Sequence, residues 1–125
     1  MGEYESEDPT LVRLERSATE GMIISSLTPS GKTNKTKTML DFEKRYKTQF
    51  GELPDVLASN AYDAIRLQAT SFVKCMGNTD CMADELTNTL NYAGVSGTIT
   101  IKADHSVEKP VIFKIIKAGK FVEIP

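Results

Sequence analysis

Apolar residues recur at two spacings along the chain, and these spacings separate predicted helices from predicted strands. Steps of three and four residues, typical of a helix with one buried face, run through 9–20, 38–50, 55–75 and 79–90. Runs rich in Ile, Val and Thr, typical of strands, occupy 22–27, 94–101 and 111–122. The last run is broken at Ala118-Gly119, where glycine permits the tight turn of a hairpin. This order predicts an α/β fold that begins without a strand before its first helix.

Short polar side chains mark where the predicted helices begin. The expected N-caps are, in chain order, Asp8 (before Pro9), Thr38 (with Asp41), Asp55, and either Thr79 or Asp80. Two helices carry apolar residues that we expect to face inward: Met39, Phe42, Tyr46 and Phe50 on one, and Leu57, Ala61, Ile65 and Phe72 on the other.

Composition and charge narrow the class of protein. The 125 residues are 40% hydrophobic and 26% charged, which is typical of a folded globular domain. The formal net charge of −2 argues against a nucleic-acid partner, and the basic run at 32–37 is interpreted as a solvated loop. No apolar stretch approaches the roughly 20 residues that cross a bilayer. The acidic segment 1–5 also lacks the apolar centre of a signal peptide.

The reactive side chains are few. Cys75 and Cys81 are either two free thiols or a disulfide that joins the ends of two helices. The disulfide would close a loop of about seven residues, stabilise the fold by roughly 2–3 kcal/mol, and place the protein outside the cytosol. With His105 far away in sequence, we expect no metal site and no cofactor. Contiguous Asp104, His105 and Ser106 cannot form a catalytic triad, so we expect no enzyme.

Several motifs, in this order, resemble one family of solute-binding proteins. They are Ala18-Thr19-Glu20-Gly21-Met22, Ala61-Tyr62-Asp63-Ala64, Gly94-Val95-Ser96-Gly97-Thr98, Lys109-Pro110-Val111 and Ala118-Gly119-Lys120-Phe121. The set is similar to the last third of the branched-chain amino acid (Leu/Ile/Val)-binding proteins of ABC importers, which are type I periplasmic binding proteins. The resemblance covers essentially the whole chain.

The resemblance implies part of a two-lobed α/β fold. It assigns residues 1–27 to the second lobe, 28–105 to the first lobe, and 106–125 to a C-terminal hairpin that returns to the second lobe. In this family the lobes close on a solute in the cleft between them, without catalysis. A C-terminal fragment of such a fold would lack strand neighbours, so we expect it to dimerise or swap through exposed sheet edges.

The resemblance also implies where a solute would bind. In members of the family an acidic residue contacts the ammonium group of the solute. The corresponding position in this chain is Tyr4, which Glu3 and Glu5 flank. The alternative interpretation of this segment is a solvated acidic loop. A wall residue of the cleft aligns with Leu57, which could instead belong to the core. The implied partners are a small solute such as an amino acid and the membrane permease of an ABC importer. The implied location is periplasmic or extracytoplasmic, with or without a lipid anchor in the full-length parent.

Two other functions fit the same residues. A ligand-sensing domain of a receptor or regulator can use the same fold, and a small self-contained α/β enzyme is a third hypothesis. The solute-binding role is our leading interpretation of the sequence.

Overall fold

The computed structural model describes residues 7, 9–14, 16–27 and 35–124. Five helices lie in these ranges: α1 Pro9–Leu14, α2 Arg16–Thr19, α3 Lys37–Phe50, α4 Val56–Lys74 and α5 Thr79–Thr87. Six strands accompany them: β1 Ile23–Ser26, β2 Tyr92–Gly94, β3 Gly97–Ile101, β4 Val107–Glu108, β5 Ile112–Lys117 and β6 Lys120–Ile124.

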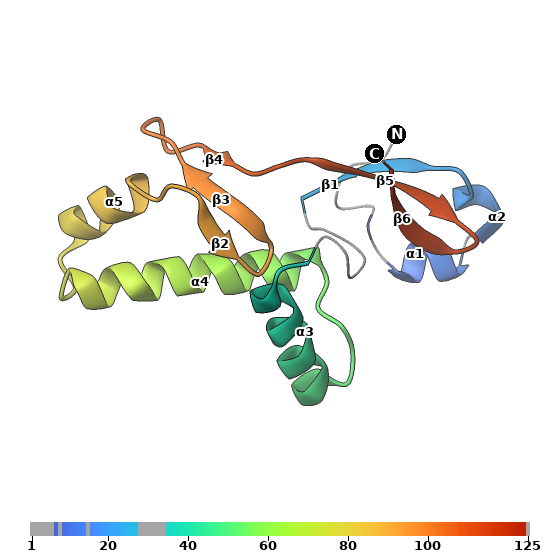
Figure 1. Ribbon diagram of the computed structural model, residues 1–125, viewed down its shortest axis with the longest axis horizontal. Helices are drawn as coiled ribbons and strands as arrows, with labels where there is room; N and C mark the ends of the chain where they lie inside the picture. The colour runs from blue at the N-terminus through green and yellow to red at the C-terminus, as the bar shows by residue number, and fades with distance from the viewer. Residues whose placement is uncertain (1–6, 8, 15, 28–34, 125) are drawn as a thin grey trace.

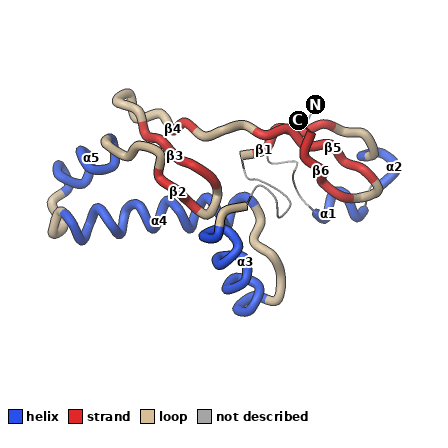
Figure 2. The backbone as a smooth tube through the Cα atoms, in the orientation of Figure 1, coloured by secondary structure: helices blue, strands red, loops and turns tan. Residues whose placement is uncertain are grey.

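The elements form two groups, each with its own antiparallel sheet (Figure 1). The first sheet has the order β1-β5-β6 and lies beside α1 and α2. The second has the order β2-β3-β4 and lies with α3, α4 and α5. Figure 2 shows α4 passing along the β2–β3 hairpin. Helix α3 lies near the beginning of α4, and helix α5 lies near the end of α4.

The predicted C-terminal hairpin is confirmed. Strands β5 and β6 pair from Phe113 opposite Ile124 to Lys117 opposite Lys120, and the turn between them is Ala118-Gly119. The Glu20 carboxylate accepts hydrogen bonds from the Ala118 amide at 2.9 and 3.1 Å, which fixes the turn beside the end of α2. The motif at 18–22, which contains Glu20, is therefore in contact with the motif at 118–121, which contains Ala118.

Residues 94–101, predicted to be one strand, form the end of β2, a turn, and all of β3. The strand prediction is wrong at Val95-Ser96, because the buried carboxylate of Asp63 binds this turn from α4. Its oxygens accept hydrogen bonds from the amides of Val95 (2.8 Å) and Ser96 (2.7 Å), and from the Ser96 hydroxyl (2.5 Å). A Cβ atom on Gly94 would lie 2.3 Å from Oδ2 of Asp63, so only glycine fits there.

The same network reaches the segment that connects β4 to β5. Nζ of Lys109 donates hydrogen bonds to Oδ1 of Asn60 (2.6 Å) and to the Ser96 hydroxyl (2.7 Å). Burial lowers the pKa of Lys109, and the nearby Asp63 carboxylate opposes that shift. The Lys109 side chain thus joins the connecting segment to α4 and to the β2–β3 turn.

Two of the predicted helix caps are displaced. Helix α3 is capped by Thr36 instead of Thr38, and the Thr36 hydroxyl accepts from the Met39 amide at 3.3 Å. Helix α5 is capped by Asn78, whose Oδ1 accepts from the Cys81 amide at 2.9 Å. In both cases a neighbouring polar side chain reaches the free amides of the first turn. Asp55 caps α4 as predicted.

The cysteines form a disulfide. Cys75, the C-cap of α4, is bonded to Cys81 in α5, with their Cα atoms 5.7 Å apart. The bond holds the two helices together at the turn between them, and the free-thiol alternative is not what the structure shows.

The apolar face of α4 is exposed, contrary to the expectation that it faces inward. Leu57, Ile65 and Phe72 are 61%, 65% and 57% exposed, whereas the buried positions of α4 include the polar Ser59, Asp63 and Ser71. Phe50, at the end of α3, is exposed as well. The part of the chain that the structure describes thus leaves a long apolar stripe uncovered, which is typical of a surface that packs on further polypeptide.

We predict that this stripe drives self-association of the isolated chain. Because Ile65 and Phe72 are exposed, the double substitution Ile65→Ser and Phe72→Ser should change the free energy of unfolding by less than about 1 kcal/mol. It should nevertheless lower the apparent mass measured by size-exclusion chromatography with light scattering. Ile116→Ala, at a fully buried position, is the contrasting control and should cost about 2–5 kcal/mol. A native chain that stays monomeric at every concentration would contradict this prediction.

Candidate functional site

A cavity of about 150 Å³ is lined by residues from both groups of elements. Its lining residues are Glu7, Lys114 and Phe121 from the first group, and Lys35, Met39, Phe42, Glu43, Leu53, Pro54, Asp55, Val56, Ser59 and Val95 from the second. An apolar cavity of about this volume takes up a molecule such as benzene, so this one has room for a small solute.

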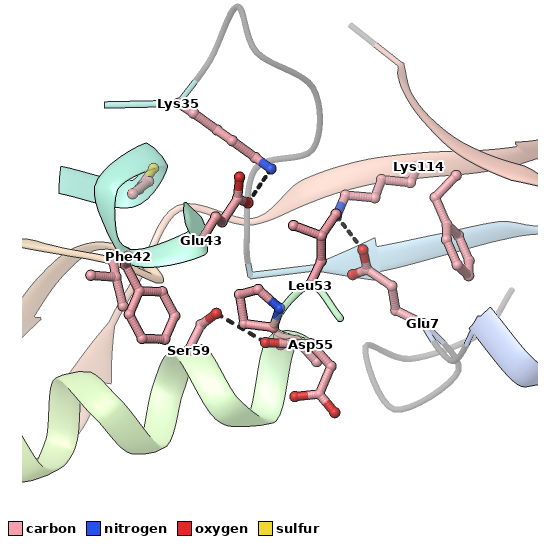
Figure 3. Close-up of a pocket in the computed structure, with 13 residues that line it drawn as sticks. Glu7, Lys35, Phe42, Glu43, Leu53, Asp55, Ser59 and Lys114 are labelled. Carbon is pink, nitrogen blue, oxygen red and sulfur yellow. Dashed lines mark hydrogen bonds and ion pairs between the residues drawn. The ribbon is translucent and has the colours of Figure 1, made fainter. Parts of the chain in front are cut away.

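One wall of the cavity carries a buried ion pair. Nζ of Lys114 on β5 donates to Oε1 of Glu7 (Figure 3). The Ser26 hydroxyl donates to the other carboxylate oxygen of Glu7 at 2.5 Å. Lys114 is only 1% exposed, since β5 is the central strand of its sheet and this side chain points inward beside the buried Ile116. Ile24 and Glu123 lie opposite Lys114 on the two neighbouring strands.

The opposite wall carries a second ion pair. Lys35, just before α3, is paired with Glu43 in α3, and both side chains are largely buried (Figure 3). Helix α3 turns Met39 and Phe42 toward the same space, where Phe42 packs against Tyr62 of α4 with ring centroids 4.6 Å apart. The cavity therefore combines an apolar floor with two pairs of opposite charges.

The start of α4 completes the lining. The Asp55 carboxylate accepts from the Ala58 amide at 2.7 Å, and the Ser59 hydroxyl donates to the Asp55 carbonyl at 2.9 Å. The hydrogen bonds fix both side chains at the helix end, and the Asp55 carboxylate adds a negative charge to the lining.

The residues that the sequence suggested for solute binding are placed differently. Glu3, Tyr4 and Glu5 lie outside the described residues. Leu57 is on the first turn of α4 and is exposed, so it does not belong to the core, and it is not among the residues that line the cavity. Its neighbour Val56 is buried and does line the cavity.

Sequence reasoning missed the four charged residues that form the ion pairs. Lys114 carried a signal, because it interrupts the apolar run of β5 at an inward-facing position. Glu7 carried none, since it belongs to an acidic N-terminal segment and its partner is 107 residues away. Within the described residues, no cluster of His, Cys, Asp and Glu could hold a metal ion, and no helix is long and apolar enough to cross a membrane.

Comparison with solved structures decides the fold. The chain superposes on the leucine-binding protein LivK of Thermotoga maritima with a TM-score of 0.85 and 23% identity, over 98% of this chain and 35% of that one. It has part of the type I periplasmic binding protein fold. The fold class predicted from the sequence is thus confirmed.

Two further solved structures show the range of ligands among proteins of similar fold. LivJ of Streptococcus pneumoniae, in complex with isoleucine, matches with a TM-score of 0.75 and 23% identity, over 91% of this chain and 34% of that one. A solute-binding protein of R. palustris, in complex with benzoate, matches with a TM-score of 0.72 and 18% identity, over 91% and 32%. This chain thus spans about a third of the length of these neighbours. No protein-family model matches the sequence, and no relative was found among curated proteins.

We predict that the Glu7–Lys114 pair as a whole contributes little to the free energy of unfolding. Removing only one partner should be costly, because the other partner then remains as an unpaired charge. Lys114→Met should lower the free energy of unfolding by about 3 kcal/mol, because the Glu7 carboxylate loses its buried counter-charge. Adding Glu7→Gln to Lys114→Met should restore most of that loss. Urea unfolding of the three proteins measures both effects, and equal stability of the single and double variants would refute this account.

Proposed function

We propose that this chain is part of an extracytoplasmic solute-binding component of an ABC importer, for a branched-chain amino acid or a related small polar solute. The observation that carries the proposal is the cavity, whose lining comes from both groups of elements. A solute held there would contact both at once, and would therefore favour the arrangement in which they are close together.

The fold and the disulfide support this proposal. The proteins of similar fold include a leucine-binding protein, one in complex with isoleucine and one in complex with benzoate, and they are substrate-binding proteins rather than enzymes. A disulfide persists in oxidising compartments, which supports a location outside the cytosol. The partners we propose are the solute and the membrane permease of the importer.

The binding residues we propose include those that the sequence suggested. Glu3, Tyr4 and Glu5 precede Glu7 in the chain, and Glu7 lines the cavity. Leu57 follows Val56, which also lines it. We propose that both segments contribute to solute contact when the two groups of elements close.

Calorimetric titration tests the proposed function. The chain, alone and within any longer protein that contains it, is titrated with leucine, isoleucine and valine. Saturable binding of at least one of them is expected, and Phe42→Ala should weaken it at least tenfold by removing the apolar floor. If no branched-chain or chemically related solute binds, the proposed function is wrong, although the fold assignment stands.

A further inference from the structure

Helix α4 carries apolar residues that are spaced symmetrically along the sequence. The centre of the pattern is Ile65, and apolar residues recur at the same distances on both sides of it. The inner members, four positions from the centre, are Ala61 and Ala69. The outer members, seven and eight positions from the centre, are Ala58 and Leu57 toward the start of the helix, and Phe72 and Val73 toward its end. We call these seven residues the α4 stripe.

The α4 stripe lies on the surface of the described part of the chain. Its large side chains are 57–76% exposed: Leu57, Ile65, Phe72 and Val73. Of its small residues, Ala61 and Ala69 are exposed and Ala58 is half-buried. With about 3.6 residues per turn, the stripe occupies the side of the helix opposite Asp63, whose carboxylate binds the β2–β3 turn. An apolar surface of this length without a charged residue is typical of a surface that packs on protein.

Symmetric spacing makes the α4 stripe complementary to a second copy of itself in antiparallel orientation. In such a pair the two-fold axis passes between the two copies of Ile65, so each residue before Ile65 lies level with the residue equally far after Ile65 in the other copy. The facing pairs are Ala61 with Ala69, Ala58 with Phe72, and Leu57 with Val73. Every pair is apolar, and alanines beside the axis allow the two helices to approach closely. Large side chains face small ones at Ala58 and Phe72, which is how well-packed helices interdigitate.

A groove beside the stripe provides space for the largest of these side chains. It has a volume of about 500 Å³ and is lined by residues of α3 and α4, including Ala58 and Ala61. Its α3 wall contains Tyr46 and Phe50, with ring centroids 4.5 Å apart, and Phe50 is 62% exposed. In the antiparallel pair, Phe72 of the other copy lies level with Ala58 and therefore at this groove. The two grooves would be filled reciprocally, as a two-fold interface requires.

We propose that the α4 stripe is the contact surface of a two-fold symmetric homodimer, in which two α4 helices pack antiparallel and are centred on Ile65. The partner is a second copy of this chain. This assigns one geometry to the self-association predicted above, and it differs from pairing through sheet edges. It is independent of the proposed function, because no residue of the α4 stripe lines the cavity.

Paired charge substitutions test the orientation of the two helices. Ala61→Glu alone places a carboxylate in an apolar contact, and should raise the dissociation constant of the dimer at least about tenfold; Ala69→Lys alone should do the same. With both substitutions in one chain, each new carboxylate faces a new ammonium group of the other copy, and the dissociation constant should return to within about threefold of the native value. A parallel pair would instead bring like charges together. Analytical ultracentrifugation over a range of concentrations measures all four proteins.

Cysteine cross-linking tests the position of the two-fold axis. Ile65→Cys brings two thiols together at the axis, so mild oxidation should give a covalent dimer on a non-reducing gel. Thr70→Cys is the matched control, because Thr70 is exposed on another side of α4 and should give no covalent dimer. Peptide mapping checks that the Cys75–Cys81 disulfide is unchanged in both variants. Both substituted positions are exposed, so the variants should fold as the native chain does.

Several outcomes would overturn the inference. A native chain that is monomeric at every concentration is one. A dimer that Ala61→Glu does not weaken is another, since pairing through sheet edges would give that result. Equal cross-linking of Ile65→Cys and Thr70→Cys would also overturn it. In a longer protein that contains this chain, a monomer whose Ile65→Cys thiol resists a soluble thiol reagent would show that the rest of that protein covers the stripe, and would overturn it as well.

Discussion

The buried carboxylate of Asp63 is the interaction on which the arrangement of this chain depends. It accepts three hydrogen bonds from Val95 and Ser96, and bonds to a charged acceptor contribute roughly 1.5–3 kcal/mol each. Through Ser96 the network extends to Lys109, at the beginning of the segment that leads to β5. One side chain of α4 thus fixes the β2–β3 turn and, through that turn, the position from which the chain crosses to the other sheet.

Those contacts also explain why separate motifs occur together in this sequence. The Tyr-Asp-Ala motif supplies Asp63, the Gly-Val-Ser-Gly motif supplies the amides that it binds, and the Lys-Pro-Val motif supplies Lys109. Gly94 is needed because a larger residue would collide with the carboxylate. Each motif is weak evidence alone, but the structure shows that they form one polar network, so that their order and spacing carry information about the fold.

The sequence predicted the elements well where the signal was local, as with the capping of α4 by Asp55 and the turn of the β5–β6 hairpin. It failed where a distant group decides the conformation, as at Val95-Ser96, where a carboxylate from α4 converts a strand-like run into a turn. It failed again for α4, because periodicity reveals an apolar face such as Ile65 and Phe72 but not what covers it. The Glu7–Lys114 pair of the cavity was missed for the same reason, because these two residues are 107 positions apart and meet only after folding.

Hydrogen–deuterium exchange of the backbone amides tests the role of Asp63 most directly. In the native chain the amides of Val95 and Ser96, although they lie in a turn, should exchange as slowly as those in the centre of β5. Asp63→Asn replaces one acceptor oxygen with an amide donor, and should accelerate exchange at both sites and across the segment around Lys109. Fast exchange of these two amides in the native chain, or no acceleration in the variant, would contradict the account.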